Sequence, residues 1–440
     1  MRWPLVLPLV LALLAGCATT DAAMRADAIA PTLTTGAGRM APSLADSPFG
    51  RQVAEAVRTH PALGAEAARI AFAQAEFDSE RAGFRPQVSL GADAGVTLVG
   101  SGTRRSTPVL QVSQLLFDGG ATRSRSEAAR ARIVRSHYDR VGTAANLALA
   151  AVEAQYTLEH EHRLLALAER NLAIHREFLE QIEDRLDAGA GTEADLLTAR
   201  SRLADATARS VGARGRLERA EAAFREVFGR SPVGRSTLRA APVLPGIGDE
   251  ELIRTSTRLR GLEAELEAAD AAVAAAEAGR LPSVSLGVAG RRGVDRRAEV
   301  TADLSVRYDL PTDGQRVAAI RGAEARRAEV AAERIELERQ IARALEFVRS
   351  DARTGRERLA AARAALDANA ASVEAAREQF GVGRRSITQL LDAQRDFVAA
   401  SEALAQAELD LALSGYAAIA LTGDILDVFG ITLPQVVPDE

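Results

Sequence analysis

The stretch that decides the fold is Gly383-Arg384-Arg385-Ser386-Ile387-Thr388-Gln389-Leu390-Leu391-Asp392-Ala393-Gln394, which interrupts a long segment of helical sequence pattern. Gly381 and Gly383 break that pattern, because glycine destabilises a helix interior by about 1 kcal/mol and suits a tight turn. Ser386 is a favourable N-cap for a new helix, and apolar residues follow it closely. The sequence therefore predicts the tip of a helical hairpin, with two arginines at the bend.

A second copy of this tip lies upstream, in Gly189-Ala190-Gly191-Thr192-Glu193-Ala194-Asp195-Leu196-Leu197. Gly383 follows Gly189 by 194 residues, and apolar series with seven-residue spacing flank both tips at the same offset. Such spacing is typical of helices that pack along their length as a coiled coil. The sequence therefore predicts a tandem duplication of long hairpins with both tips at one end. The series are Leu158, Leu165, Leu172, Leu179 and Leu186, then Leu196, Leu203, Ser210, Leu217 and Phe224, and in the second copy Leu345, Ala352, Leu359, Leu366, Val373 and Phe380, then Leu390, Phe397, Leu404, Leu411 and Ala418.

Two segments, 86–117 and 283–310, change to the period of two that is typical of β-hairpins. Each strand is near ten residues long, which suits a tilted membrane strand with a lipid-facing and a water-facing side. A half-buried soluble sheet is the alternative, although two isolated hairpins expose unpaired edges and bury little core. The alternation is clearest in one strand, with Val300, Leu304 and Val306 on one face and Glu299, Asp303 and Arg307 on the other.

The chain accordingly divides into a signal peptide, an arm, two repeats joined by a linker, and a tail. Each repeat is expected to hold a helix, a β-hairpin and two long helices that meet at a tip. No proline occurs between Pro108 and Pro232 or between Pro311 and Pro434, which permits helices of about 100 Å. The expected bounds are 1–16 for the signal peptide, 17–49 for the arm, 50–231 for the first repeat with its tip near 188–195, 232–249 for the linker, 250–425 for the second repeat with its tip near 381–388, and 426–440 for the tail.

The amino terminus has the layout of a lipoprotein signal. A positive start and a short apolar core precede Leu14-Ala15-Gly16-Cys17, which resembles a bacterial lipobox. We expect cleavage before Cys17 and lipidation of its thiol. Ala18 then favours the outer membrane, by resemblance to other lipoproteins. An ordinary signal peptide with an incidental cysteine is the alternative.

Composition excludes several classes of protein. The net charge is −5, so no large basic face indicates nucleic acid as a partner. Aromatic residues make up only 4% of the chain, which suits long interfacing helices more than a compact core. The single cysteine excludes an internal disulfide framework. No segment after the signal peptide has 18 consecutive apolar residues, so no transmembrane helix is predicted.

The sequence contains no convincing catalytic constellation. His160-Glu161-His162 is the only histidine cluster, and residues two apart on a helix point to different sides. We find no phosphate loop, nucleophile elbow or metal-ligand spacing. An enzyme is therefore not expected, and neither is a cofactor.

The layout resembles the TolC family of outer-membrane efflux and secretion proteins over about residues 49–426. The most specific pieces are residues 112–120, Val-Ser-Gln-Leu-Leu-Phe-Asp-Gly-Gly, and residues 380–394, which hold the second tip. The resemblance implies a mostly α-helical fold with membrane β-strands. It also implies a homotrimer, in which each chain supplies four strands to a shared twelve-stranded barrel and helices to a long periplasmic tunnel. The sequence is consistent with this, because four strands cannot close a barrel within one chain.

The family has two main branches. One serves type I protein secretion, with an inner-membrane ABC exporter and a periplasmic membrane fusion protein. The other serves drug export with resistance-nodulation-division (RND) pumps. Residues 117–125, 187–196 and 382–386 look more like the type I branch, which we favour, whereas the lipobox is commoner in the drug-efflux branch. A periplasmic coiled-coil adaptor is a third interpretation, and the lipid-facing strand pattern argues against it.

The family resemblance also implies a gate at the tips. Charged contacts between neighbouring tips close the periplasmic mouth, where Asp195 matches the first-tip acid and Arg385 the base that pairs with it. Asp392 matches one acid of a double ring, Gln389 stands at the other acidic position, and Phe380 stands at an aromatic position without a hydroxyl. One acidic ring and one fewer hydrogen bond are therefore expected. The alternative is a solvated loop with an ordinary surface ion pair, worth at most about 1 kcal/mol.

The polar faces of the strands supply the remaining candidates. Glu299, Asp303 and Arg307 are expected to face the barrel lumen, either as water-facing residues or as a filter for ions. Six arginines of the hairpin loops are expected to face the anionic lipid of the outer membrane, with ordinary solvation as the alternative. They are Arg104, Arg105, Arg291, Arg292, Arg296 and Arg297.

Overall fold

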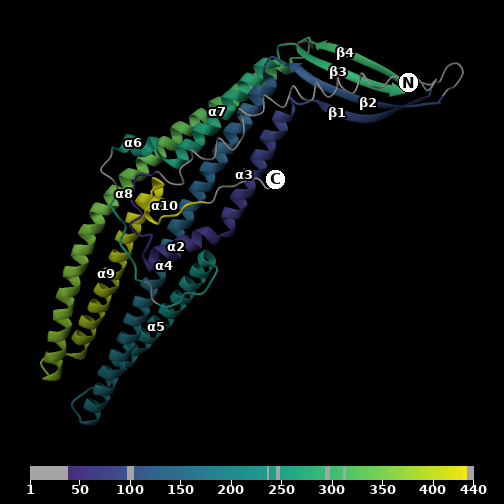
Figure 1. The fold of residues 1–440 in the computed structure, drawn as a ribbon. Helices are drawn as coiled ribbons and strands as arrows, with labels where there is room; N and C mark the ends of the chain where they lie inside the picture. Colours follow the sequence, from purple (N-terminus) through teal and green to yellow (C-terminus); the bar gives the residue numbers. More distant parts are fainter. Residues whose placement is uncertain are drawn as a thin grey trace.

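The chain forms a long, curved body with β-strands at one end and two helical tips at the other (Figure 1). This computed structural model describes residues 38–96, 104–234, 237–243, 248–292, 298–310 and 314–433. The predicted class, mostly helical with a β contribution and an internal repeat, is confirmed. Within these described ranges, no helix is both long enough and apolar enough to cross a membrane.

Four helices carry most of the length of the body. α4 (Ala121–Asp187) and α8 (Gln315–Gly381) have 67 residues each, which corresponds to about 100 Å. α5 (Glu193–Phe228) and α9 (Ile387–Leu421) return from the tips with 36 and 35 residues. The starts of α4 and α8 differ by 315 − 121 = 194 residues, and those of α5 and α9 by 387 − 193 = 194. The helices therefore repeat with the offset found in the sequence.

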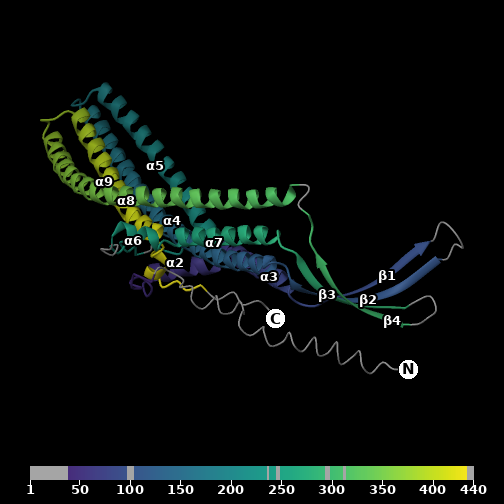
Figure 2. The same ribbon diagram turned by 90° about the horizontal axis from the view of Figure 1, so that it is seen from above.

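The helices lie side by side as one curved layer (Figures 1 and 2). Near the strands, α4 packs between α3 and α7, and α7 packs against α8. Near the tips, α4 lies between α5 and α9, and α9 packs against α8. The layer therefore has two open sides, formed by α3 and α5 on one side and by α8 on the other. The shorter helices are α2 (Pro48–Thr59), α3 (Pro61–Ala82), α6 (Asp249–Arg254), α7 (Thr257–Ala278) and α10 (Ile425–Val428).

The seven-residue apolar series lie where the paired helices meet. Leu158 packs in one core with Leu217 and Phe224 of α5, as knobs of a coiled coil do. In the second repeat, Leu345 packs with residues of α6 and α7, and Phe380 and Leu390 belong to a core at the tips. The heptad pattern thus sets which face of each helix is covered. The members with at most 9% exposure include Leu158, Leu172, Leu196, Leu217, Phe224, Leu345, Val373, Phe380 and Leu390.

The four strands form one antiparallel sheet in chain order. They are β1 (Gln87–Val96), β2 (Arg104–Phe117), β3 (Ser283–Arg292) and β4 (Ala298–Arg307). β1 pairs only with β2 and β4 only with β3 among the described strands, so the outer sides of β1 and β4 are open edges.

The register of the sheet separates apolar from polar residues. One row across the four strands is Leu90, Leu110, Gly290 and Val300. A row on the opposite face is Gln87, Ser113, Gly287 and Asp303. The large apolar side chains are uncovered, with Leu90 80% and Leu304 63% exposed, so none of the described residues covers the apolar face.

The turn from β2 into α4 is fixed by the side chain of Asp118. Its carboxylate accepts hydrogen bonds from the backbone N–H of Gly120 at 3.0 Å and from the N–H and hydroxyl of Thr122 at 2.7 and 2.6 Å. Burial alone would raise the pKa of Asp118, but these bonds outweigh it and hold the pKa below its ordinary value. Gly119, with φ of +69°, lies against Leu281, which precedes β3. This turn therefore joins the two repeats at the base of the sheet.

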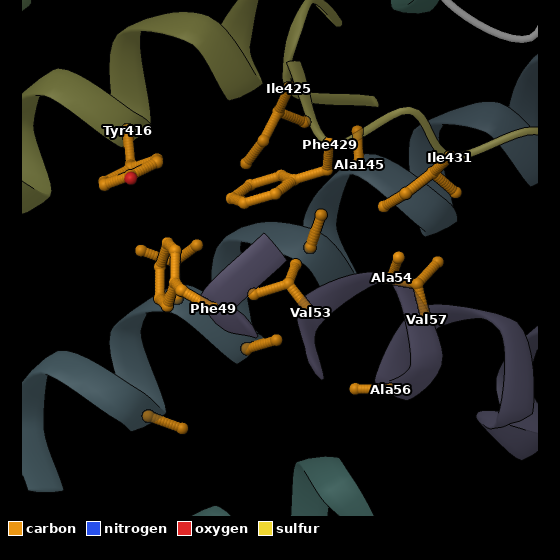
Figure 3. Packing of buried hydrophobic residues seen from close by; sticks show 14 of the residues in the cluster. Phe49, Val53, Ala54, Ala56, Val57, Ala145, Tyr416, Ile425, Phe429 and Ile431 are labelled. Carbon is orange, nitrogen blue, oxygen red and sulfur yellow. The ribbon is translucent and has the colours of Figure 1, made fainter. Parts of the chain in front are cut away.

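The largest core lies midway along the body, around an aromatic cluster (Figure 3). The ring of Phe49 lies edge-on to Tyr156, Tyr416 and Phe429, with centroids 5.8 to 6.1 Å apart. These rings come from α2, α4, α9 and the segment after α10. Phe429 is 1% exposed and Leu426 is fully buried, so the segment after residue 425, predicted to be an irregular tail, packs into this core up to Ile431.

The linker between the repeats is held against the same core. The hydroxyls of Tyr156 and Tyr416 both donate to the carbonyl oxygen of Arg239, the former at 2.7 Å. Burial raises the pKa of Tyr156 to about 12, so the phenol remains a donor at neutral pH. Ala241 approaches Gly415 so closely that a Cβ on the glycine would lie 2.9 Å from the alanine methyl. The linker thus fastens α4 to α9.

Candidate functional site at the helical tips

Both tips turn in the same way, as the repeat predicts. Gly189 and Gly383 have φ of +71° and +74°, the left-handed region that glycine adopts without strain. The N–H of Ala190 donates to the carbonyl of Arg185 at 2.8 Å, and the N–H of Arg384 donates to that of Gln379 at 2.9 Å. Since both pairs are 194 residues apart, the two tips share one backbone design.

Side chains at the start of each return helix close the turns. Thr192 accepts from the N–H of Asp195 at 3.2 Å, and Ser386 accepts from the N–H of Gln389 at 3.4 Å. The Gln389 side chain accepts in return from the N–H of Ser386, which completes a capping box. Gln389, expected at an acidic ring position, therefore stabilises the start of α9.

The predicted pair of Asp195 and Arg385 is not formed within one chain. The carboxylate of Asp195 accepts from the hydroxyl of Thr192 at 2.7 Å. Arg385 has no ion pair to any acidic residue that the structure describes. A contact between the tips of neighbouring chains remains a prediction for these two residues.

Asp392 lies between two arginines. Its carboxylate is 3.7 Å from Arg202 of α5 and 3.6 Å from Arg395 of α9, and its side chain is 42% exposed. The pair with Arg202 joins the two hairpins of the chain. Exposed ion pairs of this kind are worth about 1 kcal/mol or less. Within one chain, these two arginines therefore partly compensate the charge of Asp392.

Phe380 is the centre of a contact that the sequence analysis missed. Its ring is 6% exposed, and the guanidinium of Arg185 lies 4.2 Å from the ring centroid. Nη2 of Arg185 also donates to the carbonyl oxygens of Phe380 at 3.0 Å and Gly381 at 3.5 Å, at the end of α8. A cation favours both an aromatic face and a helix C-terminus. The sequence contains one signal for this contact. The residue 194 positions after Arg185 is Gln379, so the arginine is not repeated in the second copy.

α4 also contributes buried polar groups above the tips. Gln394 donates to Asn171 at 3.1 Å, and the two side chains are 2% and 8% exposed. His175 is buried edge-on to Phe178, with centroids 6.1 Å apart. Burial lowers the pKa of His175, and the positive charges of Arg202 and Arg209 lower it further. Burial in this part of α4 therefore favours the neutral form of His175.

The predicted lumen residues lie together on the polar face of β4. Asp303 covers Gly287 of β3, where a Cβ would lie 2.9 Å from its carboxylate oxygen. Glu299 is the register partner of Arg291, and Arg307 that of Ser283. The face carries charges of both signs next to small residues.

Several predicted residues fall outside the described parts. Cys17 lies outside them, as do Arg296 and Arg297 and the side chains of Arg104, Arg105 and Arg292. Arg291 is described and exposed. Across the described ranges, no group of three or more His, Cys, Asp and Glu side chains is placed to hold a metal ion.

Comparison with known proteins gives one consistent result. The profile of the family described as "Outer membrane efflux protein" matches residues 53–230 and 250–423, one match to each repeat. The chain is 28% identical over 373 residues to the outer membrane efflux protein BepC of Brucella suis biovar 1 (strain 1330), covering 82% of each protein.

Solved structures share the fold. CusC has a TM-score of 0.79 at 17% identity, covering 89% of this chain and 97% of its own. The outer-membrane channel OprN has a TM-score of 0.78 at 24% identity, covering 90% and 97%. The CmeC outer membrane channel of Campylobacter jejuni has a TM-score of 0.78 at 16% identity, covering 86% and 85%.

Proposed function

Because the chain belongs to the outer membrane efflux protein family, we propose that it is the outer-membrane channel of an export system and works as a homotrimer. In this proposal, three sheets close into one barrel and three helical layers close into one periplasmic tunnel. Substrate passes from an inner-membrane transporter through the tunnel and the barrel. The observation that carries the proposal is that both the sheet and the helical layer have unpaired sides. The sheet ends in β1 and β4, and the helical layer ends in α3 and α5 on one side and in α8 on the other.

The open sides occur in matching pairs. β1 and β4 each leave a row of backbone N–H and C=O groups unpaired among the described strands, and such groups in a lipid environment require partners. β4 of one chain can pair with β1 of the next. The same rotation brings α8 of one chain against α3 and α5 of the next, so all layers close with one heterologous contact.

Exposed apolar side chains mark both helical sides. Phe72 of α3 is 66% exposed and Val211 of α5 is 64% exposed. On the other side, α8 exposes Ile335 at 46% and Phe347 at 62%. Large apolar groups at a surface favour a protein or lipid partner. A second copy of the chain supplies both sides of such a contact.

We propose that the inner-membrane partner is an ABC exporter of type I secretion, joined to the channel by a membrane fusion protein. The motif residues 117–125 and 187–196 support this choice, since they resemble that branch. The second candidate is an RND pump, and the lipobox at Cys17 favours it. Purification of the complex from its own cells separates the two, because an ABC exporter or an RND pump would be recovered with the channel.

The channel itself is tested with the purified full-length chain. We expect a heat-resistant trimer in outer-membrane fractions and discrete conductance steps in planar bilayers. A soluble monomer without conductance would refute the proposal and favour a periplasmic adaptor.

The gate is tested in the same bilayers. In the trimer, Asp195 of one chain and Arg385 of its neighbour are proposed to hold the mouth closed. Asp195→Ala and Arg385→Ala should therefore both raise the closed-state conductance. Unchanged conductance in both variants would show that this contact does not close the mouth.

A further inference from the structure

A small polar cavity lies between α2, α4 and the segment that follows α5. Its volume is about 30 Å³. The polar side chains that line it include Gln52 of α2, Gln155, Glu159 and His162 of α4, and Ser231 just after α5. A single water molecule needs a cavity of roughly 10–15 Å³. The cavity therefore has room for a small ion and a water molecule, and it is too small for an organic substrate.

Gln155 contributes a buried hydrogen-bond acceptor to this cavity. Its side chain is 2% exposed, and its Nε2 donates to Oε1 of Gln52 at 2.8 Å, which orients the amide. Oε1 of Gln155 accepts no hydrogen bond from any residue that the structure describes. A buried acceptor left in this state costs about 1–3 kcal/mol, and such a group often marks the position of a bound water or ion. The cavity is therefore suited to a donor or a cation.

Two further ligand groups lie on the same face of α4. Gln155, Glu159 and His162 are spaced by four and three residues, which places them along one side of the helix. Glutamate and histidine three residues apart on a helix bind metal ions in several helical bundles. His160 instead lines a separate groove between α4, α5 and α9. The two metal-ligand side chains of the cavity are therefore Glu159 and His162.

The charges around the cavity favour a cation over an anion. Arg230 also lines the cavity, but its guanidinium pairs with the carboxylate of Glu55 at 3.1 Å. The carboxylate of Glu159 then adds a negative charge that this pair does not balance. Imidazole suits Zn²⁺, Co²⁺, Ni²⁺ and Cu²⁺, whereas Ca²⁺ and Mg²⁺ prefer six or more oxygen ligands. A divalent transition-metal ion is thus the class of ligand that fits His162 and Glu159 together.

The second repeat differs at this place. The counterpart positions, 194 residues after the three residues of α4, carry Arg349, Arg353 and Arg356. Arg349 forms an ion pair with Asp249 of α6, so the second repeat holds a side-chain cation at the position where the first repeat has the amide of Gln155. The long helix is common to both repeats and forms with either set of residues. Helix formation alone therefore does not account for the acceptors of the first repeat.

We propose that this cavity binds one divalent transition-metal ion per chain, with Glu159 and His162 as ligands and Oε1 of Gln155 as a third donor. The ion would give the buried amide oxygen its missing partner, and water would complete the coordination. Only two side chains of the His, Cys, Asp and Glu types take part, so we expect weaker binding than at a structural zinc site with four such ligands. The site belongs to the single chain and depends neither on trimer formation nor on export.

Zinc titration of the detergent-solubilised full-length protein, stripped of metal by a chelator, tests the site. Calorimetry should show one Zn²⁺ bound per chain, and Zn²⁺ should raise the thermal midpoint, because a ligand of the folded state stabilises it. His162→Asn and Glu159→Gln should each lower the affinity at least about tenfold, since even residues that only support a ligand are typically worth 10–100-fold. Both variants should also lose the shift in midpoint.

His60→Asn is the matched control. His60 is a partly exposed histidine that caps α3 and does not line the cavity, and asparagine keeps an acceptor for the cap. This variant should bind Zn²⁺ as the parent does. Cys17 is present in every variant, so differences between them report on the cavity.

Co²⁺ gives an independent spectroscopic readout. Its visible absorption should intensify on binding to the parent and to His60→Asn, and remain that of the free ion with His162→Asn. A parent with no bound Zn²⁺ and no shift in midpoint would overturn the proposal and leave a cavity that holds water only. Equal affinity in the parent, His162→Asn and Glu159→Gln would place the ion elsewhere and overturn it as well. Conductance measured in metal-free buffer tests the proposed channel function separately.

Discussion

Arg39 and Asp424 form an ion pair in which Nε and Nη2 of the arginine each lie 3.0 Å from a carboxylate oxygen. The Asp424 side chain is fully buried, and that of Arg39 is 14% exposed. Nη2 also donates to the carbonyl of Thr422 at 3.0 Å. The pair thus joins the segment before α2 to the turn between α9 and α10, at opposite ends of the sequence.

Loss of Arg39 should destabilise the protein strongly. Arg39→Met leaves the buried carboxylate of Asp424 without its cation, and removal of one partner of a buried pair typically costs about 3–5 kcal/mol. We expect a lower thermal midpoint, measured by circular dichroism of the detergent-solubilised protein. Arg51→Met is the control, because the guanidinium of Arg51 is exposed and donates, among the described residues, to the carbonyl of Asp46 alone. Equal midpoints of the two variants would show that the buried pair is not stabilising.

The turn between β2 and α4 should distinguish two adjacent glycines. Gly119 and Gly120 both have positive φ, +69° and +94°, so alanine at either position costs about 1 kcal/mol of backbone strain. At Gly119 a Cβ would also lie 2.8 Å from Leu281 and 2.9 Å from the carbonyl of Ala278, whereas nothing lies within 4 Å at Gly120. Gly119→Ala should therefore reduce the thermal midpoint and the yield of folded protein more than Gly120→Ala. Equal losses would mean that the close contact with Leu281 relaxes without cost.

The buried histidine of α4, near charged residues of α5, predicts a pH dependence. The folded pKa of His175 lies below its ordinary value of 6.5, mainly because of burial. As pH falls below 6.5, the unfolded chain takes up a proton before the folded chain does, so stability decreases until the folded pKa is reached. His160 has a lowered pKa as well, also from burial, and contributes in the same direction.

His175→Asn removes one of these groups and supplies the residue found at its counterpart, Asn369. We expect a smaller decrease of the thermal midpoint between about pH 7 and pH 5 than in the parent protein. His162→Asn, at a partly exposed histidine of the same helix, is the control. A decrease as large as that of the parent would show that His175 does not titrate in this range.

The helices and strands could be predicted because their signals are local and repeated. Heptads without proline specify helices that pack along their length, and the period of two specifies the strands. The tip at Gly383 was predicted from glycine and an N-cap, and the copy at Gly189 confirmed its place at one end. Such features depend on residues near one another in the sequence.

The contacts between hairpins could not be predicted in this way. Arg185 and Phe380 are 195 residues apart, and their contact depends on how the end of α8 lies against α4, which periodicity does not specify. The core role of residues 425–431 was missed for a similar reason, because the burial of Phe429 depends on rings from α2, α4 and α9. Gln389 was assigned to an acidic ring position from the family resemblance, whereas its capping role follows from its spacing of three residues after Ser386.

Ion selectivity should depend more on Asp303 than on Asp392. Asp392 has arginines at 3.6 and 3.7 Å, whereas Asp303 has no ion pair among the residues that the structure describes and lies next to Gly287. In a closed barrel, three uncompensated carboxylates at one level would attract cations more than three compensated ones. Asp303→Asn should therefore lower the cation preference of the channel, measured as the reversal potential across a potassium chloride gradient. Asp392→Asn should lower it less, and Asp309→Asn, at an acid beyond the end of β4 that pairs with Arg316 at 3.5 Å, is the control. A larger effect of Asp392→Asn would place the selective ring at the tips instead of in the sheet.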